Sequence, residues 1–151
     1  MDSTLNLKAE FMGRSQSLTD SRLQLQIDID DLSQIMTIRV SGYLDKSNAL
    51  EMLTSVKQKQ NRLKNYDRLY DLTKVDFHVS IAEFEDVLVS ARNLFRVKGQ
   101  QHKVAFFSDD PYVLQLVAIF KTLSQRYSYY QVDYFNTQAK AMTWLLHKED
   151  K

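Results

Sequence analysis

The fold is decided by the stretch Asp71-Leu72-Thr73-Lys74-Val75-Asp76-Phe77-His78-Val79-Ser80. The apolar run Leu69 to Leu72 predicts a buried strand, a short polar loop follows it, and Ser80 begins a long amphipathic helix. The chain after this point repeats the same order of strand, loop and helix. No part of the stretch specifies a reaction, so it predicts a fold more readily than an activity.

The helix that starts at Ser80 has the signals expected at both of its ends. Ser80 and Glu83 have the spacing of a capping box, in which each side chain binds the other residue's backbone N–H. Gly99 stands where a left-handed residue commonly ends a helix. The predicted buried stripe consists of Phe84, Leu88, Ala91 and Phe95.

Two alternating segments and a helix precede the stretch. Arg22 to Asp30 and Met36 to Gly42 alternate between apolar and polar residues, which predicts a β-hairpin. Asp45 or Ser47 then caps a helix. The end of that helix is basic, which indicates either a phosphate- or membrane-binding face or, as we favour, cations placed against the helix dipole. These basic residues are Lys57, Lys59, Arg62 and Lys64.

Two more strand and helix units follow the stretch. Lys103 to Ser108 contains a continuous apolar run, which is typical of a strand covered on both faces. Asp110 and Pro111 begin a helix that is apolar on nearly all sides. Gln131 to Phe135 is the last strand, and Asn136 or Thr137 begins the last helix. The order β-β-α-β-α-β-α-β-α predicts a single-domain α/β fold with a mixed, largely parallel sheet.

Composition excludes several classes of protein. The 151 residues include no cysteine, which excludes disulfides and Cys-ligated zinc or iron–sulfur clusters, and the net charge of +1 argues against nucleic-acid binding. The three histidines are too far apart in sequence for a typical zinc motif, and three glycines provide no phosphate-binding loop, so we expect no metal and no cofactor. No apolar run approaches the roughly 20 residues of a membrane span, so we expect a soluble, cytoplasmic protein. We expect residues 1–21 to be an extension, 22–147 the domain and 148–151 a polar tail.

Three motifs in order give a family resemblance. They are Leu69-Tyr70-Asp71-Leu72-Thr73 with Val75, then Lys103-Val104-Ala105-Phe106-Phe107 before Asp109-Asp110-Pro111, and finally Tyr134-Phe135 before Ala141-Met142-Thr143-Trp144-Leu145. Together they resemble the SpoIIAA-like family of small bacterial proteins, over about Leu23 to Leu146. The resemblance implies a fold related to the STAS domain, which is also compared with the SEC14-like (CRAL-TRIO) lipid-binding fold. Members are mostly of unknown function.

The resemblance also raises a phosphorylation hypothesis. In SpoIIAA, an Asp-Ser-Ser-Gly segment at a helix N-terminus receives a phosphate on its second serine. Here that segment falls on Val79, Ser80, Ile81 and Ala82, so only Ser80 keeps a hydroxyl. We therefore favour a capping role for Ser80 over a switch.

Three functional hypotheses remain open, in order of preference. The first is a non-enzymatic regulatory or binding module that docks a protein partner or small ligand at the carboxyl edge of the strands. Its candidate residues are Asp71, Asp76, His78, Ser80 and Asp109. The second is a SEC14-like carrier of a lipid or other apolar molecule, with a pocket lined by Phe95, Phe107, Leu116, Phe120 and Trp144. An enzyme is third, because no catalytic pair is fixed by spacing. Exposed aromatic side chains would favour a homodimer.

Overall fold

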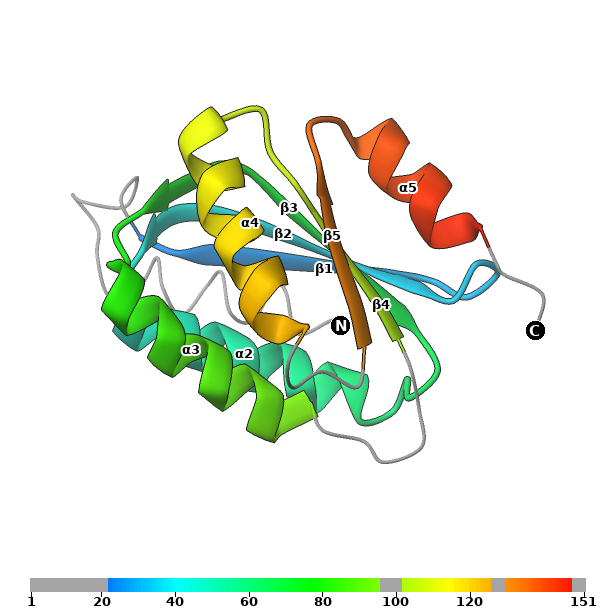
Figure 1. Ribbon diagram of the computed structural model, residues 1–151. Coiled ribbons are helices and arrows are strands. Elements are labelled where there is room, and N and C mark those ends of the chain that lie inside the picture. Colours follow the sequence, from blue (N-terminus) through cyan, green and yellow to red (C-terminus); the bar gives the residue numbers. More distant parts are fainter. Residues whose placement is uncertain (1–21, 96–101, 126–129, 148–151) are drawn as a thin grey trace.

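The structure is a computed structural model that describes residues 22–95, 102–125 and 130–147. Its centre is a five-stranded sheet with the strand order β1-β2-β3-β4-β5 (Figure 1). The strands are β1 Gln24–Asp30, β2 Ile35–Leu44, β3 Asp67–Phe77, β4 His102–Phe107 and β5 Tyr130–Phe135. The helices are α2 Lys46–Gln60, α3 Ile81–Phe95, α4 Pro111–Ser124 and α5 Gln138–Leu146.

The sheet is mixed, as the sequence predicted. β1 pairs antiparallel with β2, and the pairs β2–β3, β3–β4 and β4–β5 are parallel. The α/β class, the hairpin and the element order are confirmed. The predicted extension, the tail and the helix end at Gly99 lie outside the described residues.

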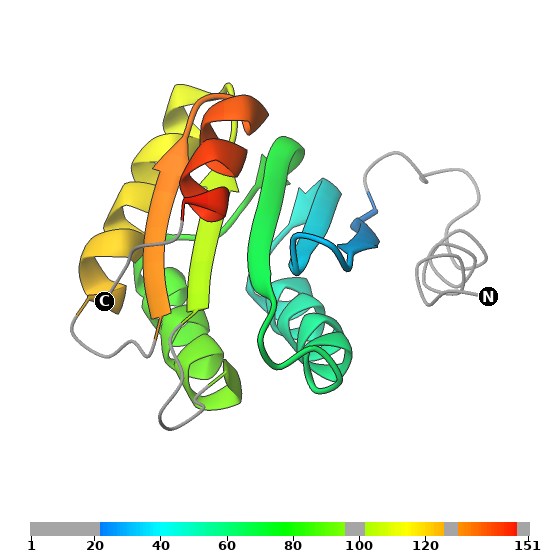
Figure 2. The same cartoon turned by 90° about the vertical axis from the view of Figure 1, so that its right-hand side faces the viewer.

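Helices cover the two faces of the sheet unequally. The helices α2, α3 and α4 lie on one face, and α5 lies on the other (Figures 1 and 2). Tyr70 and Leu72 of β3 pack in the larger cluster, whereas Leu69 packs with Leu145 of α5 in the smaller one. Successive residues of a strand point to opposite faces, so one apolar run supplies both cores.

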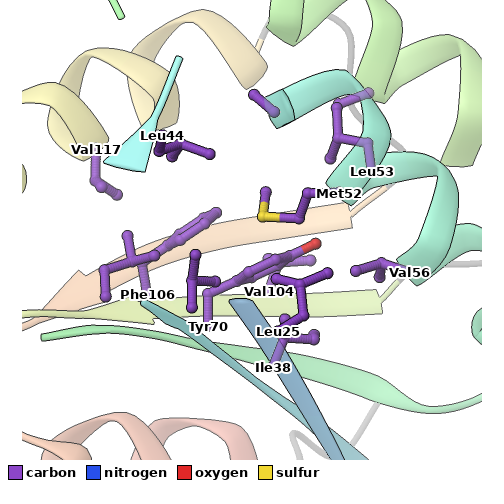
Figure 3. Packing of buried hydrophobic residues seen from close by; sticks show 14 of the residues in the cluster. Leu25, Ile38, Leu44, Met52, Leu53, Val56, Tyr70, Val104, Phe106 and Val117 are labelled. Carbon is purple, nitrogen blue, oxygen red and sulfur yellow. The ribbon is translucent and has the colours of Figure 1, made fainter. Parts of the chain in front are cut away.

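The larger core is built where the five strands meet α2, α3 and α4. Leu25, Ile38, Tyr70 and Val104 point from the sheet toward Val56 and its neighbours (Figure 3). The Tyr70 and Phe106 rings stack with their centroids 4.9 Å apart and an interplanar angle of 15°. Offset aromatic pairs of this kind add about 0.5–1.5 kcal/mol beyond the apolar area that they bury.

Strand β3 is longer than the sequence predicted. The loop expected after Leu72 is instead a strand up to Phe77, because β2 also continues and supplies backbone partners for it. A shift of register between Arg39 and Ser41 separates the two halves of this pairing. Beyond the shift, Val75 and Phe77 again pack against the larger core, so the extension is amphipathic.

The helices start where the capping signals predicted. The structure selects Asp45 rather than Ser47 as the cap of α2, and Thr137 rather than Asn136 as the cap of α5. Asp45 caps α2 and forms a capping box with Asn48, while Asp110 caps α4 with Pro111 in its first turn. Thr137 caps α5 by accepting a hydrogen bond from the backbone N–H of Lys140. Each such cap stabilises its helix by about 1 kcal/mol.

Gly42 of β2 lies closer to the backbone just before β1 than a side chain would permit. Its φ is +94°, and a Cβ at this position would lie 1.9 Å from the carbonyl oxygen of Arg22. We therefore expect Gly42→Ala to lower the free energy of unfolding by about 2 kcal/mol or more, measured by urea denaturation. Ser41→Ala, at the neighbouring position of the same strand, should change it by no more than about 0.5 kcal/mol. Equal effects of the two substitutions would contradict this account of the close approach.

Candidate functional site

The candidate polar site was predicted at the carboxyl edge of the parallel strands. β2, β3 and β4 end there at Leu44, Phe77 and Phe107. The longer β3 changes the arrangement, because Asp71 and Asp76 now stand on one strand, roughly 16 Å apart at about 3.3 Å per residue. Asp71 and Asp76 are therefore separated along β3 rather than gathered in one loop.

Asp76 and His78 form a pair at the far end of this strand. The Nε2 atom of His78 lies 3.0 Å from Oδ2 of Asp76. The His78 ring stacks on Tyr43 of β2, with centroids 4.2 Å apart and an interplanar angle of 14°. The backbone N–H of His78 donates to the carbonyl oxygen of Leu44 at 2.8 Å, which fixes the loop to β2. The side chains of His78 and Asp76 are 44% and 71% exposed, so the pair is a surface feature rather than the base of a pocket.

Asp71 is held by partners of its own. Its Oδ1 atom accepts hydrogen bonds from the backbone N–H and the hydroxyl of Thr73, at 3.0 and 2.7 Å. Its Oδ2 lies 3.5 Å from Nη1 of Arg39, and Nε of Arg39 lies 3.4 Å from Asp28. The three charged residues therefore make a row across β1, β2 and β3. The Asp71 carboxylate stabilises the sheet, and both of its oxygen atoms already have partners within the protein.

Ser80 and Asp109 occupy two separate helix entrances. The hydroxyl of Ser80 accepts from the Glu83 N–H at 3.2 Å, and the Ser80 N–H donates to Glu83 Oε1 at 3.0 Å. This is the predicted capping box at the start of α3. Asp109 is exposed in the turn before α4, where its neighbour Asp110 caps the helix. The structure thus brings together Asp76 and His78 and leaves the other three candidates apart.

Sequence reasoning missed Tyr43, which completes the cluster at this edge. The alternating pattern predicted the second strand only from Met36 to Gly42, so the predicted strand ended one residue before Tyr43. Tyr43 pairs in register with Asp76 across the two strands. A period-2 pattern continued past the glycine would have placed Tyr43 on the polar face.

The five candidates for an apolar pocket are divided between the two faces of the sheet. Phe95 and Phe120 line one cavity, between the sheet and helices α2, α3 and α4, while Leu116 is buried on α4. Phe107 and Trp144 belong to the smaller core under α5. The cavity has a volume of about 70 Å³ and mostly apolar walls. Pockets for small molecules commonly measure about 300–1,000 Å³, so this space is small for a lipid.

Two features are absent from residues 22–95, 102–125 and 130–147. No group of three or more His, Asp or Glu side chains is arranged there to hold a metal ion. No helix in the same part of the chain combines the length and the apolar character needed to cross a bilayer.

Comparison with solved structures identifies the fold. An anti-sigma factor antagonist from Mycobacterium paratuberculosis is 13% identical and has a TM-score of 0.54, covering 83% of this chain and 95% of its own. An uncharacterised protein from Shewanella loihica, described as having a SpoIIAA-like fold, is 13% identical with a TM-score of 0.52, covering 82% and 93%. This chain has a SpoIIAA-like fold.

A third structure agrees with this identification. The anti-sigma factor antagonist SpoIIAA in its unphosphorylated form gives a TM-score of 0.50 at 10% identity, covering 82% of this chain and 95% of its own. No protein-family model and no curated protein matches the sequence. The structures therefore confirm the SpoIIAA-like fold that the three motifs predicted, and at these identities they concern the fold alone.

Within this SpoIIAA-like fold, the capping role of Ser80 can be tested directly. We expect Ser80→Ala to lower the free energy of unfolding by about 1 kcal/mol, because the backbone N–H of Glu83 loses its acceptor. Ser80→Asp should preserve most of the stability, since aspartate is an equally good cap. Urea denaturation of the three proteins measures both effects. A Ser80→Ala protein as stable as the wild type would show that the hydroxyl is not needed as a cap.

Proposed function

We propose that this chain is a non-enzymatic regulatory module that binds a protein partner at the carboxyl edge of its parallel strands. Two of the solved structures with the same fold are described as anti-sigma factor antagonists, which are proteins named for an effect on other proteins. This likeness supports the class of function. The position of the binding surface is supported by the residues of this chain.

Exposed apolar side chains at that edge carry the proposal. Tyr43 is the penultimate residue of β2, Ile81 is the first residue of α3, and Tyr112 is the second residue of α4, with exposed fractions of 37%, 59% and 55%. We call these three residues and His78 the carboxyl-edge surface. Aromatic residues are enriched in protein interfaces. Apolar side chains exposed to water at the carboxyl edge of the sheet favour binding of a partner that covers them.

The polar groups of the same edge suit recognition better than a reaction. Asp71 is engaged with Arg39 and Thr73, and Asp76 and His78 are exposed to solvent. An enzyme would need these groups and Asp109 around one substrate, whereas Asp71 and Asp76 are roughly 16 Å apart along β3. A solvated histidine and carboxylate can instead supply the polar rim of an interface.

The alternative of a carrier for a lipid or other apolar molecule rests on the cavity beneath α3. Its walls include an aromatic cluster in which Phe120 lies 5.7 Å from Phe84 and 5.2 Å from Phe106, measured between ring centroids. The volume of about 70 Å³ favours a largely packed core over an occupied pocket. We therefore rank the carrier second.

A substitution at the carboxyl edge tests the first proposal. A photo-reactive residue at position 112 should crosslink a protein in cells of the native host, and the purified partner should then bind the wild-type chain. We expect Ile81→Asp to weaken that binding by at least about tenfold, since a buried apolar contact becomes a desolvated charge. The helix should tolerate this change, because an acidic residue in the first turn favours the helix dipole.

Leu32 provides the matched control. It is 99% exposed in the turn before β2, at the opposite edge of the sheet. Leu32→Asp should leave the affinity within about twofold. If both substitutions weaken binding equally, or neither does, the partner does not use the carboxyl edge.

Native mass spectrometry distinguishes the carrier from the protein-binding module. We expect freshly purified protein to have the mass of the chain without a ligand, because the cavity is small. The same spectrum, after denaturation and organic extraction, would reveal any apolar molecule that co-purifies. A stoichiometric apolar molecule would reverse our ranking and direct attention to the walls of the cavity beneath α3.

A further inference from the structure

The chain enters the described structure beside the carboxyl-edge surface. β1 runs antiparallel to β2, so it begins where β2 ends. The carbonyl oxygen of Arg22, just before β1, lies so close to Gly42 that a Cβ there would be only 1.9 Å away. The start of β1, the ends of β2 and β3 and the start of α3 thus lie at one end of the sheet (Figure 1). Residues 1–21 are therefore attached to the domain next to Tyr43, the residue that follows Gly42.

Apolar side chains exposed to water continue from this end of the sheet along α3. Tyr43 stacks on His78, and Ile81 follows three residues later as the first residue of α3. Val89 of the same helix is 46% exposed, and it lies on the side of Ile81 because residues eight positions apart share a face of a helix. These side chains offer a strip of surface that an apolar segment of chain would cover.

Residues 1–21 contain an apolar segment, and a mostly polar tract from Gly13 to Ser21 joins it to the domain. At about 3.3 Å per residue, this tract spans up to about 30 Å. Ile81 lies within that reach, because it begins α3 at the end of the sheet where the tract is attached. We call residues 5–12 the docking segment, for its four large apolar side chains Leu5, Leu7, Phe11 and Met12.

The charges at this end of the sheet favour the docking segment over a second copy of the same surface. Asp76 and Glu85 are exposed there, and within the described residues Glu85 forms no ion pair. Two such surfaces in contact would bring these carboxylates together, which is unfavourable. The docking segment instead carries Lys8 among its apolar residues and is followed by Arg14, against a single acidic residue, Glu10.

We propose that the docking segment binds the carboxyl-edge surface of its own chain, over Tyr43, His78 and Ile81, and that a protein partner must displace it. Attachment beside the site gives the segment an effective concentration in roughly the millimolar range, so a weak apolar contact is sufficient. The affinity for a partner is then reduced in proportion to the fraction of chains whose surface is uncovered. This regulation rests on the proposed function of the surface, whereas docking within the chain does not require it.

A spin label tests the docking without a partner. The chain has no cysteine, so Ser3→Cys gives a single attachment point just before the docking segment. In isotope-labelled full-length protein, we expect the label to broaden the amide signals of Tyr43, His78 and Ile81 selectively, with recovery once the label is reduced. Amide signals around Leu32 should keep their intensity, because that turn lies at the opposite edge of the sheet.

Paired substitutions in residues 1–21 distinguish apolar docking from an effect of charge. Leu7→Asp with Phe11→Asp should abolish the selective broadening, because it places two carboxylates in the apolar contact. Ser15→Asp with Ser17→Asp adds the same charge outside the docking segment and should leave the broadening in place. Equal effects of the two pairs, broadening spread evenly over the domain, or no broadening at all would overturn the docking.

A mixed sample identifies which chain supplies the bound segment. Isotope-labelled protein without the spin label is combined with spin-labelled protein that carries no isotope. We expect no selective broadening in this sample, because attachment favours the segment of the same chain. Broadening as strong as in the doubly labelled protein would show that a second copy supplies the segment, and would overturn docking within the chain.

The effect on partner binding is measured with the protein identified by crosslinking. Leu7→Asp with Phe11→Asp should tighten binding by at least about threefold, as expected when the surface is covered in roughly two-thirds or more of the chains. Ser15→Asp with Ser17→Asp should change the affinity by less than about twofold. An affinity that Leu7→Asp with Phe11→Asp leaves unchanged or weakens overturns the regulation. Absence of any partner would contradict the proposed function alone, because the spin-label experiment needs none.

Discussion

The architecture depends on the double burial of strand β3. A parallel strand in the middle of a sheet must be covered on both faces, because its side chains alternate between them. Leu69 meets α5 on one face while Tyr70 and Leu72 meet α2, α3 and α4 on the other. Every helix of the described chain is positioned by this requirement, and so is the edge at which the candidate site lies.

The elements were predictable because their signals are local. Caps such as Ser80 with Glu83, the alternation of the hairpin and the apolar run of β4 each lie within a few residues, so the sequence alone was sufficient. Other features depend on partners that are distant in the chain. The extension of β3 needs the extra residues of β2, and Asp71 is engaged by Arg39, 32 positions earlier. A run of apolar residues also gives no sign of which helix each one will meet, which is why Phe107 and Phe120 were expected in one pocket and lie on opposite faces.

Two parts of the surface have different origins in the same architecture. The carboxyl-edge surface forms where strands give way to helices, so exposed residues such as Ile81 and Tyr112 arise in the first turns. A small hollow at the opposite edge forms where α2 returns to the start of β3 and leaves space that Arg68 and Phe95 only partly fill. Helix α2 spans both, because Asn48 in its first turn donates a hydrogen bond to the carbonyl oxygen of Tyr43 and its last turn includes Lys57. A rigid element therefore connects two surfaces with different chemistry.

The shift of register between β2 and β3 also limits how the length of this chain can vary. Beyond it, Val75 and Phe77 face the core, while Tyr43 and Asp76 lie side by side in register. Adding or removing one residue between Asp71 and Val75 would turn Val75 and Phe77 away from the core and Asp76 toward it, because the faces of a strand alternate with every residue. A change of length in the turn at Leu32 does not have this effect. The turn is exposed, and the pairing of β1 with β2 starts only outside it, at Asp30 and Ile35. We therefore expect insertions to be tolerated better in the turn at Leu32 than within β3.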